Sequence, residues 1–524
     1  MKHLKLRRFI VASVSGYLVW GCSTNAWALN LNFRPSVFLQ EVYSDNIRLA
    51  PKGEEQSAWV TAITPGFFVN GQSGRYNLNL NYRLQGIYNA GGDSGIDLNH
   101  QLQYNSNYIL SPGRFFVQSR SSISQQNISN TRIVSDNFTG DQSNTATIST
   151  FGIAPTWTPR FGSYANGMAR ASYDRVSSSQ GPLSDTDSFS QNVMLNSGRY
   201  FSKVGWRLNF NNRINQNSSG EDIRFQDSDA LLRYNLNRKF SLIAQGGYAN
   251  NDFQSTTGFS RNGFYYNFGG QWRPSQRFSV SAGYGNNSYV TVFFSPFQRL
   301  QASVTYRNND IGTNTGDVWQ GSLRYFTPRS VVNLTYNEDT TTVQQVLMEE
   351  RTFLRLSGLP SDINMDDLVT ALGLDSSDIS WTRDNSGDIL FNTRLPTLTD
   401  DVFVRRRGQL SYSYRTGKSI LSANVFTERR TFQESQVKDE VYGIRGTWMW
   451  RFMPRTNTFL SSGYQVTDTD FSTDNRFDMA FRVQRSILRQ LNGNIEYRYI
   501  NQSSNTNINS FDENRVTLNL MAFF

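Results

Sequence analysis

Cysteine and histidine are almost missing from this sequence. Its 524 residues include one cysteine, Cys22, and two histidines, His3 and His100. A disulfide joins two cysteines, and a structural zinc site uses about four cysteine or histidine ligands. The chain therefore forms no disulfide within itself, and metal sites built from several thiolates are excluded.

Long apolar runs, flexible spacers and blocks of like charge are missing as well. Mean hydropathy is −0.51. Beyond the first 21 residues no stretch approaches the roughly 18 consecutive apolar residues of a transmembrane helix. A chain of this length normally holds several domains, yet no Pro-rich or Ser/Gly-rich segment divides it. The sequence predicts one uninterrupted unit without transmembrane helices.

The N-terminus has the pattern of a secretory signal peptide. Residues 1–8, MKHLKLRR, carry four basic side chains and no acid, residues 9–21 are mostly apolar, and residues 26–28 read AWA. A basic segment, an apolar segment and an A-x-A sequence together predict export and cleavage after the second alanine. Residues 1–28 are thus the expected signal, and residues 29–524 the mature chain.

Removal of the signal changes the composition. Cys22 lies inside it, so the mature chain has no cysteine, although it enters an oxidising compartment. The alternative, lipoprotein-type processing at Cys22, fits less well because the bulky Trp20 precedes it. Four basic residues leave with the signal, so the net charge falls from +9 to about +5 (9 − 4). This mild charge argues against a nucleic-acid partner, which would need clustered basic residues.

Aromatic residues are abundant in a chain that is polar on average. They make up 14% of the residues, with 37 Phe and 25 Tyr. In residues 76–85, YNLNLNYRLQ, apolar side chains alternate with Asn, Arg and Gln, and residues 491–499, LNGNIEYRY, repeat the pattern. Period-two alternation predicts strands with one apolar and one polar face. The alternating segments run about 10 to 16 residues, which is longer than the roughly 5 to 6 of ordinary strands.

The connections alternate between short and long. Eleven short connections are predicted at 70–75, 111–114, 158–162, 202–205, 237–240, 274–277, 295–299, 327–330, 415–419, 453–456 and 486–490. Longer polar loops lie between them. Two strands per short turn, plus the first and last strands, give 24. An even strand number with short periplasmic turns and long outer loops is typical of bacterial outer-membrane barrels. The sequence therefore predicts an all-β fold, a single antiparallel transmembrane β-barrel of about 24 strands (22–26), in the Gram-negative outer membrane.

The C-terminal segment NRVTLNLMAFF, residues 514–524, alternates up to Phe524. A barrel closes when its last strand pairs with its first. We expect residues 514–524 to be that closing strand and Phe524 to be the signal read by the barrel assembly machinery.

One segment, about residues 342–401, breaks the alternating pattern. Within it, SDINMDDLVTALGL at 361–374 predicts a short helix, with Asn364 as N-cap and Gly373 at its end. By parity the insertion lies on the outer side of the barrel. It can cap the barrel, fold inward as a plug, or form a surface excursion.

Catalytic motifs are missing from the mature chain. A Ser–His–Asp hydrolase would have to use His100, which lies in the strand-like sequence DLNHQLQY and faces either the lumen or lipid. No metalloprotease, phosphate-binding or EF-hand motif occurs at the proper spacing. We predict no enzyme activity, no cofactor, no metal site and no catalytic residues.

The predicted inward face offers the candidate functional residues. If apolar side chains face lipid, then Arg445, Asp478, Arg482, Glu496 and Arg498 line the lumen. Both charge signs occur. The residues either pair with one another to stabilise a hydrated wall, or form a pore lining that holds a polar solute. A lumen wall lined by Asn, Gln, Tyr and Arg side chains is suited to the passage of sugars and polyanions.

Three stretches together resemble a known family. They are PSVFLQEVYSDNIRLAP (35–51), ITPGFFVNGQSGRYNLNLNYRLQGIYN (63–89) and LPTLTDDVFVRRRGQLSYSY (395–414). The chain resembles the outer-membrane β-barrel family associated with PEP-CTERM systems, over essentially the whole mature chain. The resemblance implies a barrel that works beside exopolysaccharide machinery, with no catalytic residues to carry across.

The leading hypothesis is therefore an outer-membrane conduit for extracellular polysaccharide. Its expected partners are outer-membrane lipid, the barrel assembly machinery, periplasmic polysaccharide-export proteins and the polysaccharide itself. The alternatives are a porin for a small polar solute, an outer-membrane hydrolase that depends on His100, and a structural or adhesive barrel. A sheath for a multihaem cytochrome is disfavoured by the lack of cysteine in the mature chain.

Overall fold

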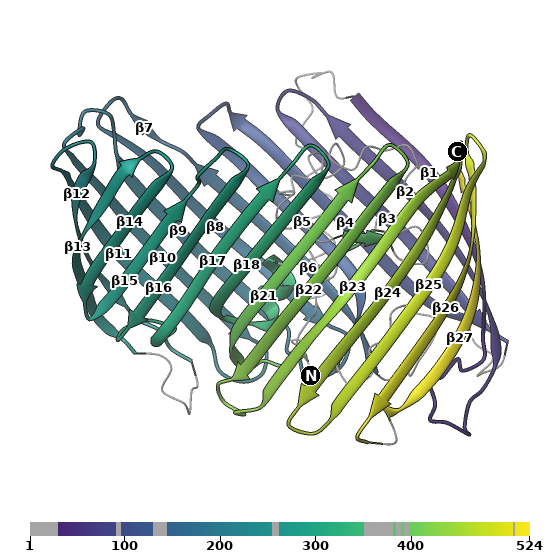
Figure 1. Ribbon diagram of the computed structural model, residues 1–524. Coiled ribbons are helices and arrows are strands. Elements are labelled where there is room, and N and C mark those ends of the chain that lie inside the picture. Colours follow the sequence, from purple (N-terminus) through teal and green to yellow (C-terminus); the bar gives the residue numbers. More distant parts are fainter. Residues whose placement is uncertain are drawn as a thin grey trace, which may run out of the picture.

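The computed structural model describes residues 30–90, 96–128, 144–253, 261–349, 381–383, 389–391, 398–506 and 509–524. Within these residues, one antiparallel sheet closes on itself to form a barrel (Figure 1). The first half of the wall consists of β1 (Asn30–Ser44), β2 (Ala58–Gln72), β3 (Tyr76–Asn89), β4 (Ile96–Ser111), β5 (Phe115–Asn127), β6 (Thr145–Trp157), β7 (Arg160–Phe161), β8 (Ala165–Ser178), β9 (Thr186–Ser197), β10 (Val204–Asn217), β11 (Ile223–Asn235), β12 (Phe240–Ala249) and β13 (Gly263–Ser275).

The second half continues in chain order and contains the one interruption. Its strands are β14 (Phe278–Gly285), β15 (Asn287–Phe294), β16 (Leu300–Asn309), β17 (Gly316–Phe326), β18 (Ser330–Thr342), β21 (Val402–Arg415), β22 (Ser419–Phe432), β23 (Lys438–Met453), β24 (Thr456–Thr469), β25 (Thr473–Leu488), β26 (Leu491–Ser504) and β27 (Phe511–Phe523). Between β18 and β21 lie the helix α2 (Val343–Glu349) and a small separate hairpin, β19 (Trp381–Arg383) and β20 (Ile389–Phe391).

The strand number and the closure agree with the sequence prediction. Neighbouring strands pair antiparallel in chain order, and β27 pairs with β1 from Ser36↔Phe523 to Ser44↔Arg515. The two-residue β7 pairs with β8 and extends the edge that β6 occupies, past a break at Pro159. The described wall therefore has 24 strands, so the predicted all-β barrel and its closing strand are confirmed.

Each of the eleven predicted short turns lies between two consecutive wall strands, at the end of the barrel where β1 begins and β27 ends. The opposite end is less regular than predicted, because not every connection there is long. Asn286 alone joins β14 to β15. Its side-chain Nδ2 donates to the Phe264 carbonyl (2.9 Å) and its Oδ1 accepts from the Tyr266 amide (2.7 Å). These bonds hold Asn286 against β13.

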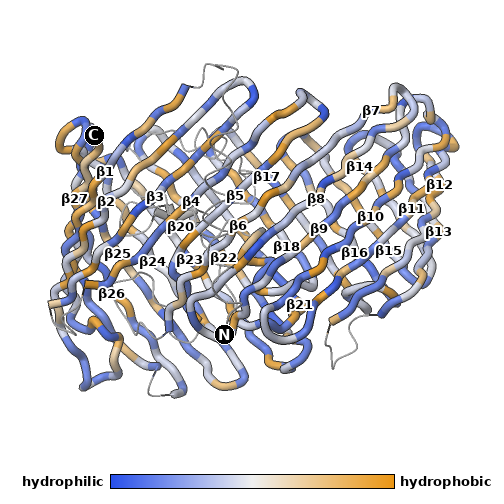
Figure 2. The backbone as a smooth tube through the Cα atoms, turned by 180° about the vertical axis from the view of Figure 1, so that it is seen from behind, coloured by the Kyte–Doolittle hydropathy of each residue, from blue (hydrophilic) through white to orange (hydrophobic). Residues whose placement is uncertain are grey.

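The wall alternates across its thickness. Hydrophobic and hydrophilic positions interchange along the strands (Figure 2). On β25, Phe477, Met479 and Phe481 are exposed on the outside of the barrel, whereas Asp478 and Arg482 are buried on the inside. Because successive side chains of a strand point to opposite faces, this pattern gives an apolar outer surface and a polar lumen.

Aromatic side chains bound the apolar outer surface at both ends. Trp59 and Trp319 are exposed near the loop end, while Trp157, Trp272 and Trp448 are exposed near the short-turn end. Between them the exposed side chains include those of Leu232, Leu334 and Val425. Aromatic girdles that flank an apolar band mark the two membrane interfaces of an outer-membrane barrel. The protein is an outer-membrane β-barrel.

Among the described residues, no helix is long and apolar enough to cross a membrane.

Candidate functional site

The loop end of the lumen is crossed by the first part of the insertion. Helix α2 follows β18 directly, and it contacts β18 on one side and β6 and β8 on the other. Strands β8 and β18 are ten steps apart in the 24-strand ring, so they belong to nearly opposite walls. The helix therefore connects two walls across the outer mouth of the barrel.

An apolar cluster holds α2 in this position. We call it the mouth core. Its buried members are Ala146, Ile148, Val176, Leu183, Val343, Val346, Leu347, Met348, Leu398, Phe403 and Phe432. They come from β6, β8, the β8–β9 loop, α2, the residues before β21, and β21 and β22 themselves. Burial of these side chains stabilises the mouth in the same way as a small domain core.

Two neighbouring acids fix the returning limb of the insertion. The Asp400 carboxylate accepts hydrogen bonds from the Ser184 amide (2.9 Å) and from Gln344 Nε2 of α2 (2.7 Å). The Asp401 carboxylate accepts from the amides of Gln433, Glu434 and Ser435 in the β22–β23 loop. Leu398 adds a bond from its amide to the Ile128 carbonyl, 2.9 Å long. Residues 398–401, LTDD, thus hydrogen-bond to three loops, those between β5 and β6, β8 and β9, and β22 and β23.

The two described ends of the 342–401 insertion pack into the mouth core and hydrogen-bond to the loops around it. The helix predicted at 361–374 lies outside the described residues. Sequence reasoning missed α2, because VQQVLME is too short to give a helical period that can be distinguished from a strand end.

The lumen is not polar throughout, which corrects the assumption that all apolar side chains face lipid. Near the loop end, Val42, Val60, Ala62 and Ile87 face inward and are buried. Ile47 of the β1–β2 loop packs against them. The loop folds over this part of the wall, and apolar inward residues provide the surface on which it packs.

The five predicted lumen residues lie on β23, β25 and β26, with β24 between the first two, on the face opposite the exposed apolar side chains. Arg445 Nη2 and Asp478 Oδ1 are 2.7 Å apart, and Arg482 Nε and Glu496 Oε2 are 2.8 Å apart. The side chains of Arg482 and Glu496 are only 4% and 1% exposed. Arg498 pairs in register with Ala480 and Arg515. Arg445 with Asp478 and Arg482 with Glu496 thus form two ion pairs.

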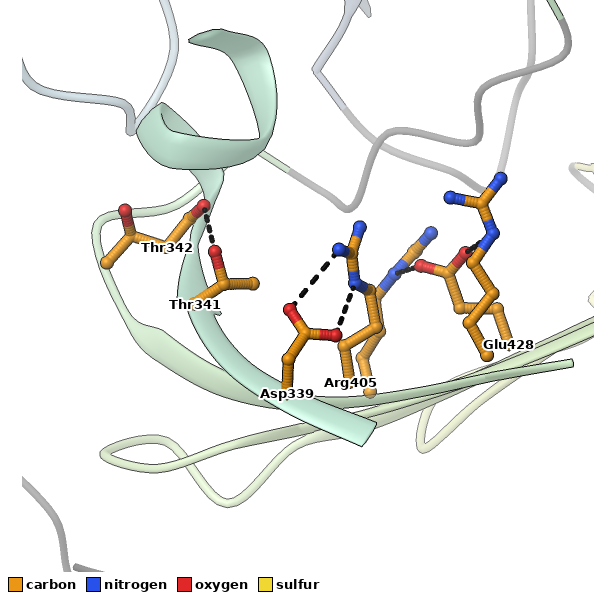
Figure 3. A network of polar contacts seen from close by, with 7 residues as sticks. Asp339, Thr341, Thr342, Arg405 and Glu428 are labelled. Carbon is orange, nitrogen blue, oxygen red and sulfur yellow. Dashed lines mark hydrogen bonds and ion pairs between the residues drawn. The ribbon is translucent and has the colours of Figure 1, made fainter. Parts of the chain in front are cut away.

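A second charged cluster, absent from the prediction, lies on β18, β21 and β22 below the mouth core (Figure 3). Arg405 Nη2 is 3.2 Å from Asp339 Oδ2. Glu428 lies between two arginines, 2.7 Å from Arg430 Nε and 3.9 Å from Arg407 Nε. The sequence RRRG at 405–408 could have predicted this cluster. Alternation places its first and third arginines on one face of the strand and its second arginine on the other.

A cavity of about 250 Å³ separates α2 from the wall formed by β5, β8, β9 and β10. We call it the α2 cavity. Its charged lining residues are Arg120, Arg170, Asp174 and Arg213, and the rest are Ser172, Val176, Thr186, Ser188, Ser190, Asn192, Asn215, Gln344, Gln345 and Met348. Arg120 Nη2 contacts Asp174 Oδ1 at 3.2 Å. Alternation alone could have assigned each of the wall residues to the inner face. Which of them meet around one cavity depends on strand register and on the position of α2.

His100 lies on the wall strand β4. It is exposed on the outer face of β4, where its Nδ1 is 2.9 Å from the Tyr82 hydroxyl. Among the described residues, no group of three His, Cys, Asp or Glu side chains could hold a metal ion.

Phe524 follows the closing strand directly. Its amide donates to the Pro35 carbonyl at 3.0 Å, while its side chain is 69% exposed. The residue is available at the short-turn end, and its role as an assembly signal stays a prediction.

Comparison with known proteins gives remote structural likeness. No family model and no curated protein matches the chain. Solved structures to which it is similar include the siderophore receptor PirA from Pseudomonas aeruginosa, with a TM-score of 0.41 and 10% identity over 94% of this chain and 80% of that one. Another is the FrpB iron transporter from Neisseria meningitidis, with a TM-score of 0.43 and 11% identity over 94% and 82%. Nothing about the solute of this chain follows from likeness at this level.

Proposed function

We propose that the protein is a conduit through which an extracellular polysaccharide crosses the outer membrane, without covalent catalysis. The observation that carries the proposal is a closed 24-strand barrel with charged and amide side chains on its inner face. A barrel of this strand number is wide enough for a channel or a plugged lumen. Paired charges and amides can exchange hydrogen bonds with successive sugar hydroxyls without holding any one of them tightly.

The choice of a polysaccharide rests on the resemblance of residues 35–51, 63–89 and 395–414 to the PEP-CTERM-associated barrels. The third of these stretches contains the LTDD sequence that ties the mouth together. In the proposed conduit, this motif holds the outer mouth closed until a polysaccharide chain arrives. A polymer that leaves through the mouth has to displace α2 and residues 398–401.

A clean gene deletion tests the proposal. Polysaccharide is measured outside the cells and in the periplasm, for the deletion strain and for strains that carry the intact gene or His100→Ala. We expect loss outside, accumulation inside, and full restoration by both genes. Unchanged export would overturn the conduit, and failure of His100→Ala alone would favour the hydrolase.

A porin for a small polar solute is the second candidate, and the α2 cavity is the observation that favours it. A cavity of this size takes a single sugar-sized group rather than a polymer segment. Impaired uptake of a small solute by the deletion strain, together with normal polysaccharide export, would select this alternative.

A further inference from the structure

We infer that the outer surface of the barrel between β16 and β24 binds a phosphorylated acyl lipid of the outer leaflet. Its acyl chains lie in an apolar groove, and its phosphate lies on two outward arginines. The inference concerns the membrane-facing surface, so it does not depend on which solute passes through the lumen. It is carried by the shape of this surface, by its charges and by their order along the strands.

The groove has a volume of about 810 Å³ and lies on the outside of the wall. Its exposed apolar side chains are those of Val304, Trp319, Leu334, Leu410, Val425, Tyr442, Ile444 and Tyr464. Its lining also includes Gly321 and Gly408, which flank Tyr336 in the register of β17, β18 and β21. Glycine lets a ligand approach the backbone closely, so acyl chains can lie against the wall at these positions.

Two arginines lie directly beyond the groove. Arg406 of β21 and Arg429 of β22 are opposite each other in the register, and both are exposed. Each is two residues nearer the loop end of its strand than a groove residue, Gly408 or Thr427, and residues two apart on a strand share one face. The loop end of an outer-membrane barrel faces the cell exterior. Charge outside and an apolar groove inside is the order of a head group and its acyl chains in the outer leaflet.

The acids around the two arginines compensate them only in part. Arg406 Nε is 3.7 Å from Glu338 Oε2, whereas Arg429 forms no ion pair in the described part of the chain. Glu440 and Asp468 follow on the next two strands of the same row. Like charges directly opposite on neighbouring strands repel each other. An anion held between the two guanidinium groups would offset this repulsion, and arginine is well suited to phosphate.

The inner face of the same two strands shows an arginine pair that the protein neutralises itself. Arg405 and Arg430 are also opposite each other in the register. Asp339 lies 3.2 Å from Arg405, and Glu428 lies 2.7 Å from Arg430 (Figure 3). On the outer face, a lipid phosphate takes the place that these carboxylates have on the inner face.

Native mass spectrometry of the purified, delipidated barrel tests the inference, because it counts the lipids bound to each copy. The probes are lipid A with two phosphates and phosphatidylethanolamine, whose head group has no net charge. We expect lipid A to bind at least about tenfold more tightly than phosphatidylethanolamine, since hydrogen bonds between ionised groups are the strong ones.

Arg429→Gln is the main variant, because it removes a charge without leaving an acid unpaired. It should weaken binding of lipid A about tenfold and leave phosphatidylethanolamine unchanged, and Arg406→Gln provides a second variant. The matched control is Arg175→Gln on β8. Arg175 is also exposed near the loop end, but Asp185 and Asp187 lie 3.8 Å and 3.4 Å from it. Its substitution should change either affinity less than about twofold, as a surface charge that is already paired does.

Gly321→Phe tests the groove separately from the charges. A β-carbon at this position would meet only the Ser303 carbonyl oxygen, at 3.8 Å, so the ring can enter the groove without straining the wall. It should weaken both lipids by a similar factor. Heat-modifiable migration on a gel verifies that every variant is folded.

Equal affinity of the wild type for both lipids would overturn the inference. So would an equal loss of lipid A binding in Arg429→Gln and Arg175→Gln, because the effect would then come from the overall charge of the barrel. A lipid-free dimer that Gly321→Phe converts to a monomer would also overturn it, since the groove would then hold a second copy of the chain.

Discussion

Two stretches of the same wall present charges to the lumen in different ways. On β25 and β26, Arg482 and Glu496 neutralise each other in a buried pair. On β5, β8 and β10, three arginines surround a cavity with one aspartate. Both stretches follow the same alternating sequence pattern, so alternation alone does not separate a wall of buried ion pairs from a wall that borders a cavity. The difference is an opposing element, α2, which faces the second stretch across the cavity.

The largest effect should come from breaking the paired stretch. Glu496→Ala leaves the buried Arg482 without its ion-pair partner, and a buried charge without its partner costs about 3–5 kcal/mol. Urea unfolding in lipid vesicles, followed by tryptophan fluorescence, measures the loss. The double variant Arg482→Met with Glu496→Met should restore most of the stability, since a hydrophobic pair of similar volume replaces a buried ion pair at little cost.

Arg170→Gln sharpens the contrast in the same assay, because it should change the free energy of unfolding by less than about 1 kcal/mol, in line with partly exposed charges. If Glu496→Ala and Arg170→Gln were equally destabilising, the distinction between the two stretches would be wrong.

The next largest effect should be local to the mouth core. Leu398 is fully buried, and Leu398→Ala should destabilise its surroundings by about 2–5 kcal/mol. Hydrogen exchange should accelerate at the Leu398 amide, which donates to Ile128, and in α2. Exchange in the β1–β27 seam serves as the internal control. Uniform acceleration throughout the wall would contradict a separate mouth core.

A smaller effect is expected from a substitution that weakens charged hydrogen bonds at the mouth instead of its apolar packing. Asp400→Asn weakens the bonds that Ser184 and Gln344 donate, at a cost of about 1.5–3 kcal/mol for bonds to a charged group. Planar-bilayer recordings should show a larger or more frequent open conductance than in the wild type. Asp401→Asn, whose partners lie in the β22–β23 loop and not on α2, is the matched variant and should change conductance less.

The smallest effect on the folded barrel should come from Phe524→Ala. Its exposed ring adds little packing, and its backbone bond to Pro35 remains. We expect a change in unfolding free energy of less than about 0.5 kcal/mol, as for most exposed positions. Folded barrel in the outer membrane should nevertheless accumulate more slowly in cells. Normal accumulation would contradict the predicted assembly signal.

The sequence predicted the wall far better than the mouth. Period-two alternation and turns such as SPGR (111–114) are local signals, and the even strand number follows from counting them. The Arg482–Glu496 pair was accessible because alternation placed both residues on the inner face. The path of α2 could not be predicted from the sequence, because it depends on contacts such as Leu398 with Ile128 and Asp400 with Ser184. Residues so far apart in the chain leave no local pattern.

The most direct test of the central claim, that solute passes through the lumen, is a chemical block of the lumen in living cells. The predicted mature chain has no cysteine, so Ser190→Cys on β9, which lines the α2 cavity, gives a unique attachment point for a bulky maleimide. Lys52→Cys on the exposed β1–β2 loop is the matched control. The account predicts that labelling stops polysaccharide release only in Ser190→Cys. Unchanged release from fully labelled Ser190→Cys cells would contradict it.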